Sequence, residues 1–125
     1  MAENSNKPII LVDMAKNRLR IHRSTLSAIG KPEFILIIVN PEARTIGIMP
    51  CDDNNPGAHR VKTQSVMGKN CFELYSSSFT GKLREVRPDW VIAGKYRMEG
   101  EIIPGEPVAR FNMDAATFTG MGKVR

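Results

Sequence analysis

Cysteine, histidine and tryptophan are scarce in this sequence, which has two, two and one of them among its 125 residues. Cys51, His59 and Cys71 do not have the spacing of a zinc motif. Neither His59 nor His22 has a carboxylate neighbour at a spacing typical of a catalytic pair. Two cysteines in a cytosolic chain are more often small buried hydrophobes than a disulfide. We therefore expect no metal and no cofactor.

Long apolar runs are also missing. A membrane-spanning helix needs about 18 to 20 apolar residues, whereas the longest run here, Phe34 to Val39, has the length of a strand. The first residues, MAENSNKP, lack the apolar centre of a signal peptide. No Gly-rich loop of the Walker type occurs, and Ser76 to Ser78 are better explained as a helix cap than as nucleophiles. These absences favour a cytoplasmic protein that is not an enzyme and does not enter a membrane.

The composition is that of a soluble globular protein, with 42% hydrophobic and 25% charged residues. Its length suits one domain, or two very small ones that share a core. The net charge of +5 favours partners that carry negative charge. That inference is weak until the positions of the basic residues are known.

Two similar tetrapeptides, MAKN at 14–17 and MGKN at 67–70, indicate an internal repeat with an offset of 53 residues. The same offset places apolar residues on apolar residues in the segments that follow: Leu19 on Phe72, Ile21 on Leu74 and Leu26 on Phe79. Further on, KPEF at 31–34 is similar to RPDW at 87–90, as a short insertion would produce. Several ordered matches favour a diverged duplication over chance.

The first repeat has the pattern strand, strand, short helix, strand, strand, with strands at 9–14, 18–22, 34–39 and 45–49. Residues 18–22 alternate strictly, so Leu19 and Ile21 should face the core and the basic residues between them should face outward. Asn17 suits the tight turn before this strand. Ser24 suits the N-cap of a helix at 25–29.

The second repeat is expected to have the same order of elements. Its strands are predicted at 60–66, 71–75, 96–103 and 108–113, and its helix runs from a Ser77 cap to Val86, with 90–93 as an extra apolar segment. The sequence therefore predicts a first unit at 9–50, a linker at 51–59 and a second, diverged unit at 60–113. Residues 1–8 and 115–125 are expected to be flexible tails.

This order of elements and the basic first hairpin, NRLRIHRSTLSAIGKPEFILIIVNPEARTIGIMP at 17–50, resemble the AbrB/MazE swapped-hairpin DNA-binding family. The resemblance covers 9–50 well and 60–113 loosely. It implies a mainly β fold with short helices, in which duplicated β-β-α-β-β units interleave into one AbrB-like, double-psi-related barrel. In the family the two units usually come from a homodimer. The sequence departs from the family at 22–24, where a proline is usual, and the second repeat has Glu73 where the first has Arg20.

Interleaving also has a physical argument in its favour. A unit of about 50 residues is marginal as an independent domain, because it buries too little of its surface. The two repeats together provide enough apolar residues for one core. Whether they pair within one chain, as a monomeric pseudo-dimer, or between two chains, as a homodimer, stays open.

From Met14 to Pro32 there are five basic residues and no acidic one. A two-stranded ribbon fits the major groove of duplex DNA, where guanidinium groups bond phosphates or guanine edges. The sequence therefore predicts a DNA-binding site, with Lys31 and Lys69 as auxiliary contacts, at Lys16, Arg18, Arg20, His22, Arg23, Lys31 and Lys69. The function indicated is a transcriptional regulator or an antitoxin-like repressor. Because outward positions should not support the core, replacing Arg18 and Arg20 by alanine should weaken binding without unfolding the protein.

Three alternatives stay open from the sequence. The basic face is a solvated surface without a ligand, or it binds RNA, or it docks on an acidic protein partner. In the last case the protein is an interaction or inhibitory module, and the contact segment is the region of Trp90 or the tail from Ala115 to Arg125. Tyr75, at the position equivalent to His22, should also face outward and is a weak sign of a second binding surface.

Overall fold

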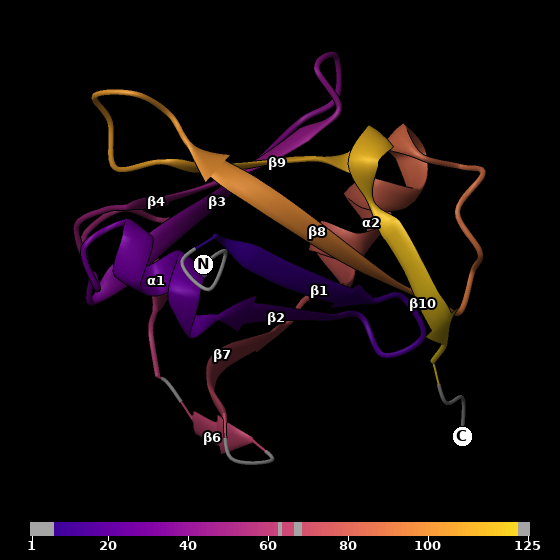
Figure 1. The fold of residues 1–125 in the computed structure, drawn as a ribbon, viewed down its shortest axis with the longest axis horizontal. Coiled ribbons are helices and arrows are strands. Elements are labelled where there is room, and N and C mark those ends of the chain that lie inside the picture. Colours follow the sequence, from indigo (N-terminus) through magenta and orange to yellow (C-terminus); the bar gives the residue numbers. More distant parts are fainter. Residues whose placement is uncertain (1–6, 63, 67–68, 123–125) are drawn as a thin grey trace, which may run out of the picture.

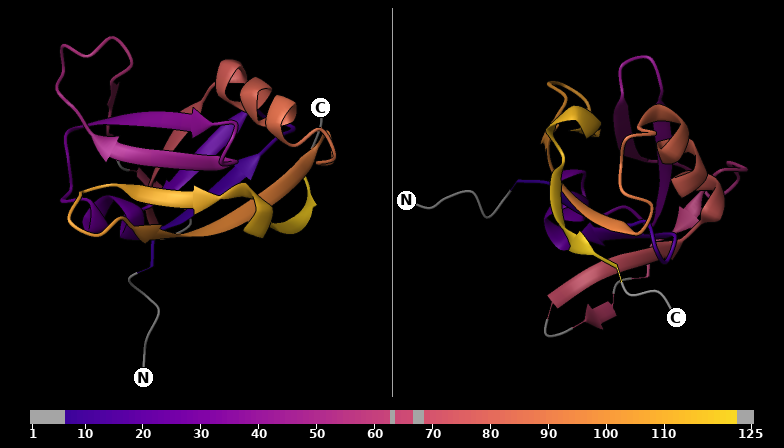
Figure 2. Two further views of the ribbon diagram at one scale, coloured as in Figure 1. Left: turned by 90° about the horizontal axis from the view of Figure 1, so that it is seen from above. Right: turned by 90° about the vertical axis from the view of Figure 1, so that its right-hand side faces the viewer.

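A computed structural model of the chain describes residues 7–62, 64–66 and 69–122 and shows a mainly β protein with short helices, as the sequence predicts (Figures 1 and 2). The helices are α1 (Arg23–Ala28), α2 (Ser77–Val86) and a short 3-10 helix, η1 (Met113–Ala115). The strands are β1 (Ile9–Asp13), β2 (Arg18–His22), β3 (Phe34–Asn40), β4 (Thr45–Pro50), β5 (His59–Arg60), β6 (Gln64–Val66), β7 (Lys69–Tyr75), β8 (Gly94–Ile102), β9 (Ala109–Asn112) and β10 (Thr117–Met121).

The strands form one curled antiparallel sheet. Its order is β5-β3-β4-β9-β8-β1-β2-β7-β6, and β10 pairs with β8 beside this path. Hairpin partners lie next to each other in β1–β2, β3–β4, β6–β7 and β8–β9. The hairpins are joined by pairings between the two halves of the chain, namely β1 with β8, β2 with β7 and β4 with β9. The first and last strands of this order, β5 and β6, are separated by only three residues of the chain, 61–63. The two edges of the sheet are therefore joined covalently.

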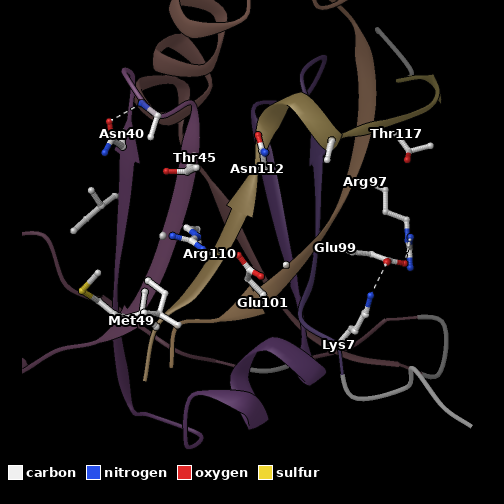
Figure 3. A pocket seen from close by; sticks show the side chains of 17 residues that line it. Lys7, Asn40, Thr45, Met49, Arg97, Glu99, Glu101, Arg110, Asn112 and Thr117 are labelled. Carbon is white, nitrogen blue, oxygen red and sulfur yellow. Dashed lines mark hydrogen bonds and ion pairs between the residues drawn. The ribbon is translucent and has the colours of Figure 1, made fainter. Parts of the chain in front are cut away.

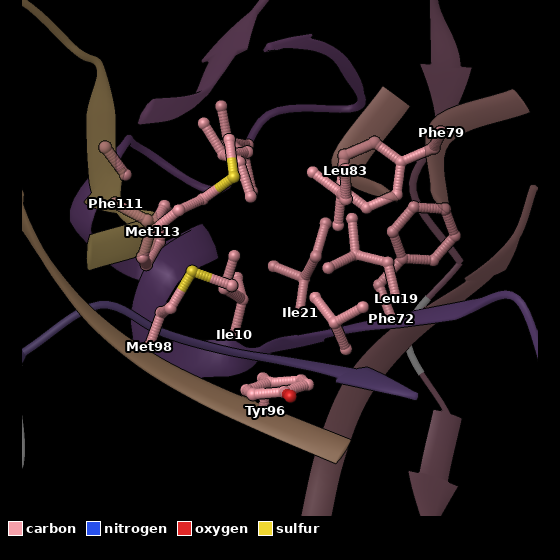
Figure 4. Close-up of a cluster of buried hydrophobic side chains, with 14 of the residues drawn as sticks. Ile10, Leu19, Ile21, Phe72, Phe79, Leu83, Tyr96, Met98, Phe111 and Met113 are labelled. Atoms are coloured by element: carbon pink, nitrogen blue, oxygen red, sulfur yellow. The ribbon is translucent and has the colours of Figure 1, made fainter. Parts of the chain in front are cut away.

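The core lies inside the curl of the sheet, with α2 over one side of it (Figure 4). Leu19 and Ile21 of β2 are buried, as their alternation predicts. They face side chains from the other half of the chain, such as Phe72 of β7 and Leu83 of α2. Both halves of the chain therefore contribute to one core.

Helix α1 begins two residues earlier than predicted, and α2 begins one residue earlier. α1 has His22, not Ser24, as its N-cap, and the ring Nδ1 accepts a hydrogen bond from the backbone N of Ser24 at 3.2 Å. Strand β2 runs directly into this helix, so its last residue, with extended backbone angles, takes the capping position. In α2 the cap is Ser76, whose Oγ accepts from the N of Phe79 at 3.0 Å.

The two similar tetrapeptides do not occupy equivalent positions in their hairpins. MAKN forms the β1–β2 turn, and Asn17 has the left-handed φ of 51° expected of it. Lys69 and Asn70, by contrast, already lie within β7, and Val66 pairs with Lys69. Met67 and Gly68 lie outside the described residues. The strand predicted at 60–66 is divided into β5 and β6, because β5 pairs with β3 whereas β6 pairs with β7.

The segments expected to be flexible tails contain ordered structure. Strand β10 pairs with β8 from Thr117 opposite Arg97 to Met121 opposite Gly94. Near the other end of the chain, Pro8 is buried and its carbonyl accepts a hydrogen bond from the N of Gly100 at 2.8 Å. These segments are ordered because β8 is longer than the strands that flank it and leaves backbone groups for them to pair with.

The end of α2 is fixed to η1 by one arginine. The Nη1 of Arg87 donates to the carbonyl of Met113 at 2.9 Å and to Asp114 at 3.2 Å. Its Nε and Nη2 donate to the two carboxylate oxygens of Asp89 at 2.9 and 2.7 Å. The same guanidinium lies 5.5 Å from the ring centre of Trp90. Arg87 thereby joins the helix, the segment after it and η1.

We expect the pH response of Asp89 to report this contact. The hydrogen bond from Arg87 lowers the pKa of Asp89 from 3.8 to about 2. Since the pKa is lower in the folded state, the pair stabilises the fold above about pH 4 and this contribution is lost as the pH falls towards 2. An NMR titration of the carboxyl carbon should give a midpoint near 2, and Arg87→Gln should return it towards 3.8. A wild-type midpoint already near 3.8 would contradict the contact.

Candidate nucleic-acid interface

The outward face of β2 is shared with its two neighbouring strands. Arg18 lies opposite Asp13 of β1 and Tyr75 of β7, and Arg20 lies opposite Glu73 of β7. Directly opposite residues in an antiparallel sheet share a face. The surface predicted to be purely basic therefore carries two carboxylates from neighbouring strands. Tyr75 is exposed, as predicted.

Both arginines of β2 are engaged in ion pairs with these carboxylates. The Nε of Arg20 donates to the Oε2 of Glu73 at 2.7 Å, and its Nη2 also contacts this oxygen. The Nη2 of Arg18 donates to the Oδ2 of Asp13 at 3.2 Å. The side chains of Glu73 and Asp13 are only 12% and 6% exposed. The arginines thus neutralise two nearly buried charges, so we now expect them to support the fold as well.

Asp13 also organises the β1–β2 turn. Its Oδ1 accepts hydrogen bonds from the backbone N of Ala15 at 3.1 Å and of Lys16 at 3.3 Å. This arrangement fixes the turn and leaves the side chain of Lys16 exposed at its tip. Lys16 makes no ion pair with the residues that the structure describes.

The remaining predicted contacts lie at the other end of β2. Arg23 is exposed at the first position of α1, and His22 caps that helix with its Nδ1 directed at Ser24. Lys31 is exposed where α1 ends, and its backbone N donates to the carbonyl of Leu26 at 2.7 Å. The structure therefore brings Arg18 and Arg20 together on one strand and places Lys16 and Arg23 at its two ends. Lys69 lies in β7, and its side chain is outside the described residues.

Two basic residues of this face were missed from the sequence. Lys95 and Arg97 of β8 lie opposite Asp13 and Leu11 of β1, on the same outward face. The alternation of β8 signals that they face outward, but the sequence gives no sign that β8 lies beside β1. Arg97 forms an ion pair with Glu99 at 2.9 Å.

A groove of about 1020 Å³ lies on the outer side of β3, β4, β9 and β8 (Figure 3). Its charged side chains are paired with one another: Arg110 contacts Glu101 at 2.6 Å, and Glu99 contacts both Lys7 at 3.8 Å and Arg97. Figure 3 shows these pairs among neutral side chains such as Thr45 and Asn112. This nearly neutral groove has neither the excess of cations that attracts a polyanion nor the cluster of carboxylates that attracts a cation.

The two cysteines are free thiols. Cys71 lies opposite His22 in β7 and is buried, and burial raises the pKa of its thiol. A protonated thiol is a poor nucleophile and a poor metal ligand. Within the described ranges, no three side chains of the metal-binding types come together. The longest helix described, α2, has ten residues, and no described helix has the length and apolar character for a bilayer crossing.

Comparisons with protein-family models, with curated proteins and with solved structures found no match for this chain. The resemblance to the AbrB/MazE family therefore stays an expectation from the sequence.

Proposed function

We propose that the protein binds duplex DNA through the outward face of the β1–β2 hairpin and the start of α1, as a small transcriptional regulator or antitoxin-like repressor. The observation that carries this proposal is a row of cations along β2 and at its two ends, formed by Lys16, Arg18, Arg20 and Arg23. Ion pairing does not remove the arginines from such a role. A guanidinium has five N–H donors, so donors remain for a phosphate.

The proposal includes a duplicated, interleaved organisation of AbrB-like type. Strands β2 and β7 are the equivalent strands of the two predicted repeats, and they pair antiparallel with Arg20 opposite Glu73. These two residues differ by the repeat offset of 53. A local twofold axis through this pair would relate the two strands, so the register is compatible with a pseudo-dimer. The pairing of β4 with β9 likewise joins equivalent strands of the two repeats.

Salt-dependent DNA binding is the test. We expect a labelled random duplex to show binding by fluorescence anisotropy. The logarithm of the affinity should fall linearly with the logarithm of the salt concentration, because phosphate contacts release counterions. Lys16→Gln with Arg23→Gln should weaken binding and lower the salt slope by about 2, since each lost phosphate contact removes about 1. The matched control is Lys82→Gln with Arg110→Gln, which changes the net charge equally at exposed positions on α2 and β9.

The outcomes separate function from site. No binding at low salt would contradict the proposed function. Equal losses in the two double variants would show a general effect of net charge and would contradict the proposed site.

A further inference from the structure

Four large apolar side chains are exposed at one end of the molecule. Val91 and Ile92, in the segment before β8, are 41% and 78% exposed, and Phe118 and Met121 of β10 are 49% and 57% exposed. A Cβ atom placed on Gly94 would lie 3.1 Å from Val91 and 3.2 Å from Phe118. Met121 lies opposite Gly94 in the β8–β10 pair. Val91, Phe118 and Met121 are therefore gathered around Gly94, and Ile92 follows Val91 in the chain. We call these four residues the β10 patch.

The β10 patch stands on a rigid aromatic support. Trp90 is buried and stacks on Tyr96 with a centroid distance of 4.1 Å, and Tyr96 meets Phe118 edge-on at 5.6 Å. The hydroxyl of Tyr96 accepts a hydrogen bond from the N of Val91 at 2.8 Å. The patch thus continues the core to the surface in a fixed arrangement, which lowers the entropy cost of binding.

Strand β10 also presents an open edge beside the patch. It pairs with β8 on one side, and none of the described strands pairs with its other side (Figures 1 and 2). Its sequence, TFTGM, has no charge and no proline. Natural proteins usually protect such edges, because unpaired N–H and C=O groups recruit another strand. An extended segment can pair here and place alternate side chains on the apolar patch.

The charges around the patch select the occupant. Residues 90–98 and 115–122 contain no acidic side chain. Lys95 lies opposite Gly120 of β10. Gly122 packs against Asp13, whose carboxylate is paired with Arg18, and against Ala15, next to the exposed Lys16 of the β1–β2 turn. A second copy of this chain would bring these lysines against one another, on a molecule whose net charge is already +5. A segment with acidic residues between apolar ones is complementary to both features.

We propose that β10 and the β10 patch bind an extended segment of a partner protein, in which apolar residues alternate with acidic ones. The segment adds a strand to the open edge of β10. Its apolar side chains cover the patch, and its carboxylates meet Lys95 and Lys16. This site shares Lys16 and Lys95 with the outward basic face, but it does not depend on DNA binding there.

A synthetic peptide of alternating valine and glutamate tests the proposal. Trp90 is the only tryptophan, and it lies beneath the patch, so its fluorescence should change saturably as the peptide binds. Ile92→Ser with Met121→Ser should weaken binding at least about tenfold, as the loss of central apolar contacts does in other interfaces. Tyr75→Ser, at another exposed ring, is the matched control and should leave binding unchanged.

Two further peptides separate the contributions. A valine–lysine peptide should bind at least about tenfold more weakly if the charges select the partner. A peptide with alternate backbone nitrogens methylated should lose binding if strand pairing is required, because its side chains are unchanged. Circular dichroism checks that the variants are folded. We expect the double serine variant to fold, because the side chains of Ile92 and Met121 are mostly exposed.

Three outcomes would overturn the proposal. The first is no saturable change with the valine–glutamate peptide at millimolar concentration. The second is a dimer in sedimentation equilibrium that the double serine variant abolishes, because the patch would then belong to a second copy. The third is quenching of Trp90 fluorescence by a single-stranded oligonucleotide, if the substitution Phe118→Ser abolishes that quenching. The exposed ring of Phe118 would then stack on a base.

Discussion

Replacing Phe111 by alanine should lower the free energy of unfolding by about 3–5 kcal/mol, the usual cost of truncating a fully buried aromatic side chain. Phe111 is 0% exposed and lies in β9, opposite Ile46 of β4 and Gly100 of β8. A Cβ atom on Gly100 would lie 2.6 Å from its ring, so the ring fills the space directly over that backbone. Because paired strands bound the site, the cavity cannot collapse and the full cost remains.

Urea denaturation followed by Trp90 fluorescence measures this loss. Domains of this size have a total stability of about 5–15 kcal/mol, so the loss should be a large and easily measured part of the total. Phe118→Ala removes the same atoms from a side chain that is 49% exposed. It should cost about 1 kcal/mol, the value of an aromatic contact such as the one with Tyr96. Equal losses in the two variants would contradict the position of Phe111 in the core.

The elements that were predicted correctly are those with a strong local pattern. The alternation of residues 18–22 and the apolar run that begins at Phe34 fix β2 and β3 without any knowledge of their neighbours. The end of α2 at Val86 was also predicted correctly. These signals are contained within single segments, so tertiary contacts did not change them.

Strand β10 was missed because its order comes from its neighbour. TFTGM is short, contains glycine and leaves Phe118 and Met121 exposed, so it lacks the alternation of a half-buried strand. It forms because β8 offers an unpaired edge beyond the end of β9. The strand predicted at 71–75 forms the rest of β7, but its first two residues were missed for a similar reason. Lys69 and Asn70 look like turn residues and become strand residues by pairing with β6.

The candidate site shows the same division. The outward direction of Arg18 and Arg20 follows from alternation alone and is correct. Their ion pairs were missed because the acid-free interval was counted along the sequence. Asp13 lies one residue before that interval, and Glu73 comes from the other repeat. The repeat contained the missing information, because antiparallel pairing of equivalent strands places Glu73 opposite Arg20.

Replacing Arg20 alone by alanine should therefore destabilise the protein by about 1–3 kcal/mol, because it leaves the carboxylate of Glu73 nearly buried and unpaired. Glu73→Gln in the same chain should restore most of this loss, since a neutral amide has a lower desolvation cost than a carboxylate. Urea denaturation of the two single variants and the double variant measures the coupling. An Arg20→Ala variant as stable as the wild type would contradict the role of the ion pair.

The same pair gives a DNA-binding test in which stability and net charge are controlled. Arg20→Gln with Glu73→Gln removes one charge of each sign, so the net charge of +5 is kept. If Arg20 contacts a phosphate, this variant should bind duplex DNA more weakly and lower the salt slope by about 1. Glu73→Gln alone frees the guanidinium and should tighten binding. Equal affinities of the double variant and the wild type, which have the same net charge, would exclude Arg20 from the interface. The interface would then be restricted to the exposed cations at the two ends of β2.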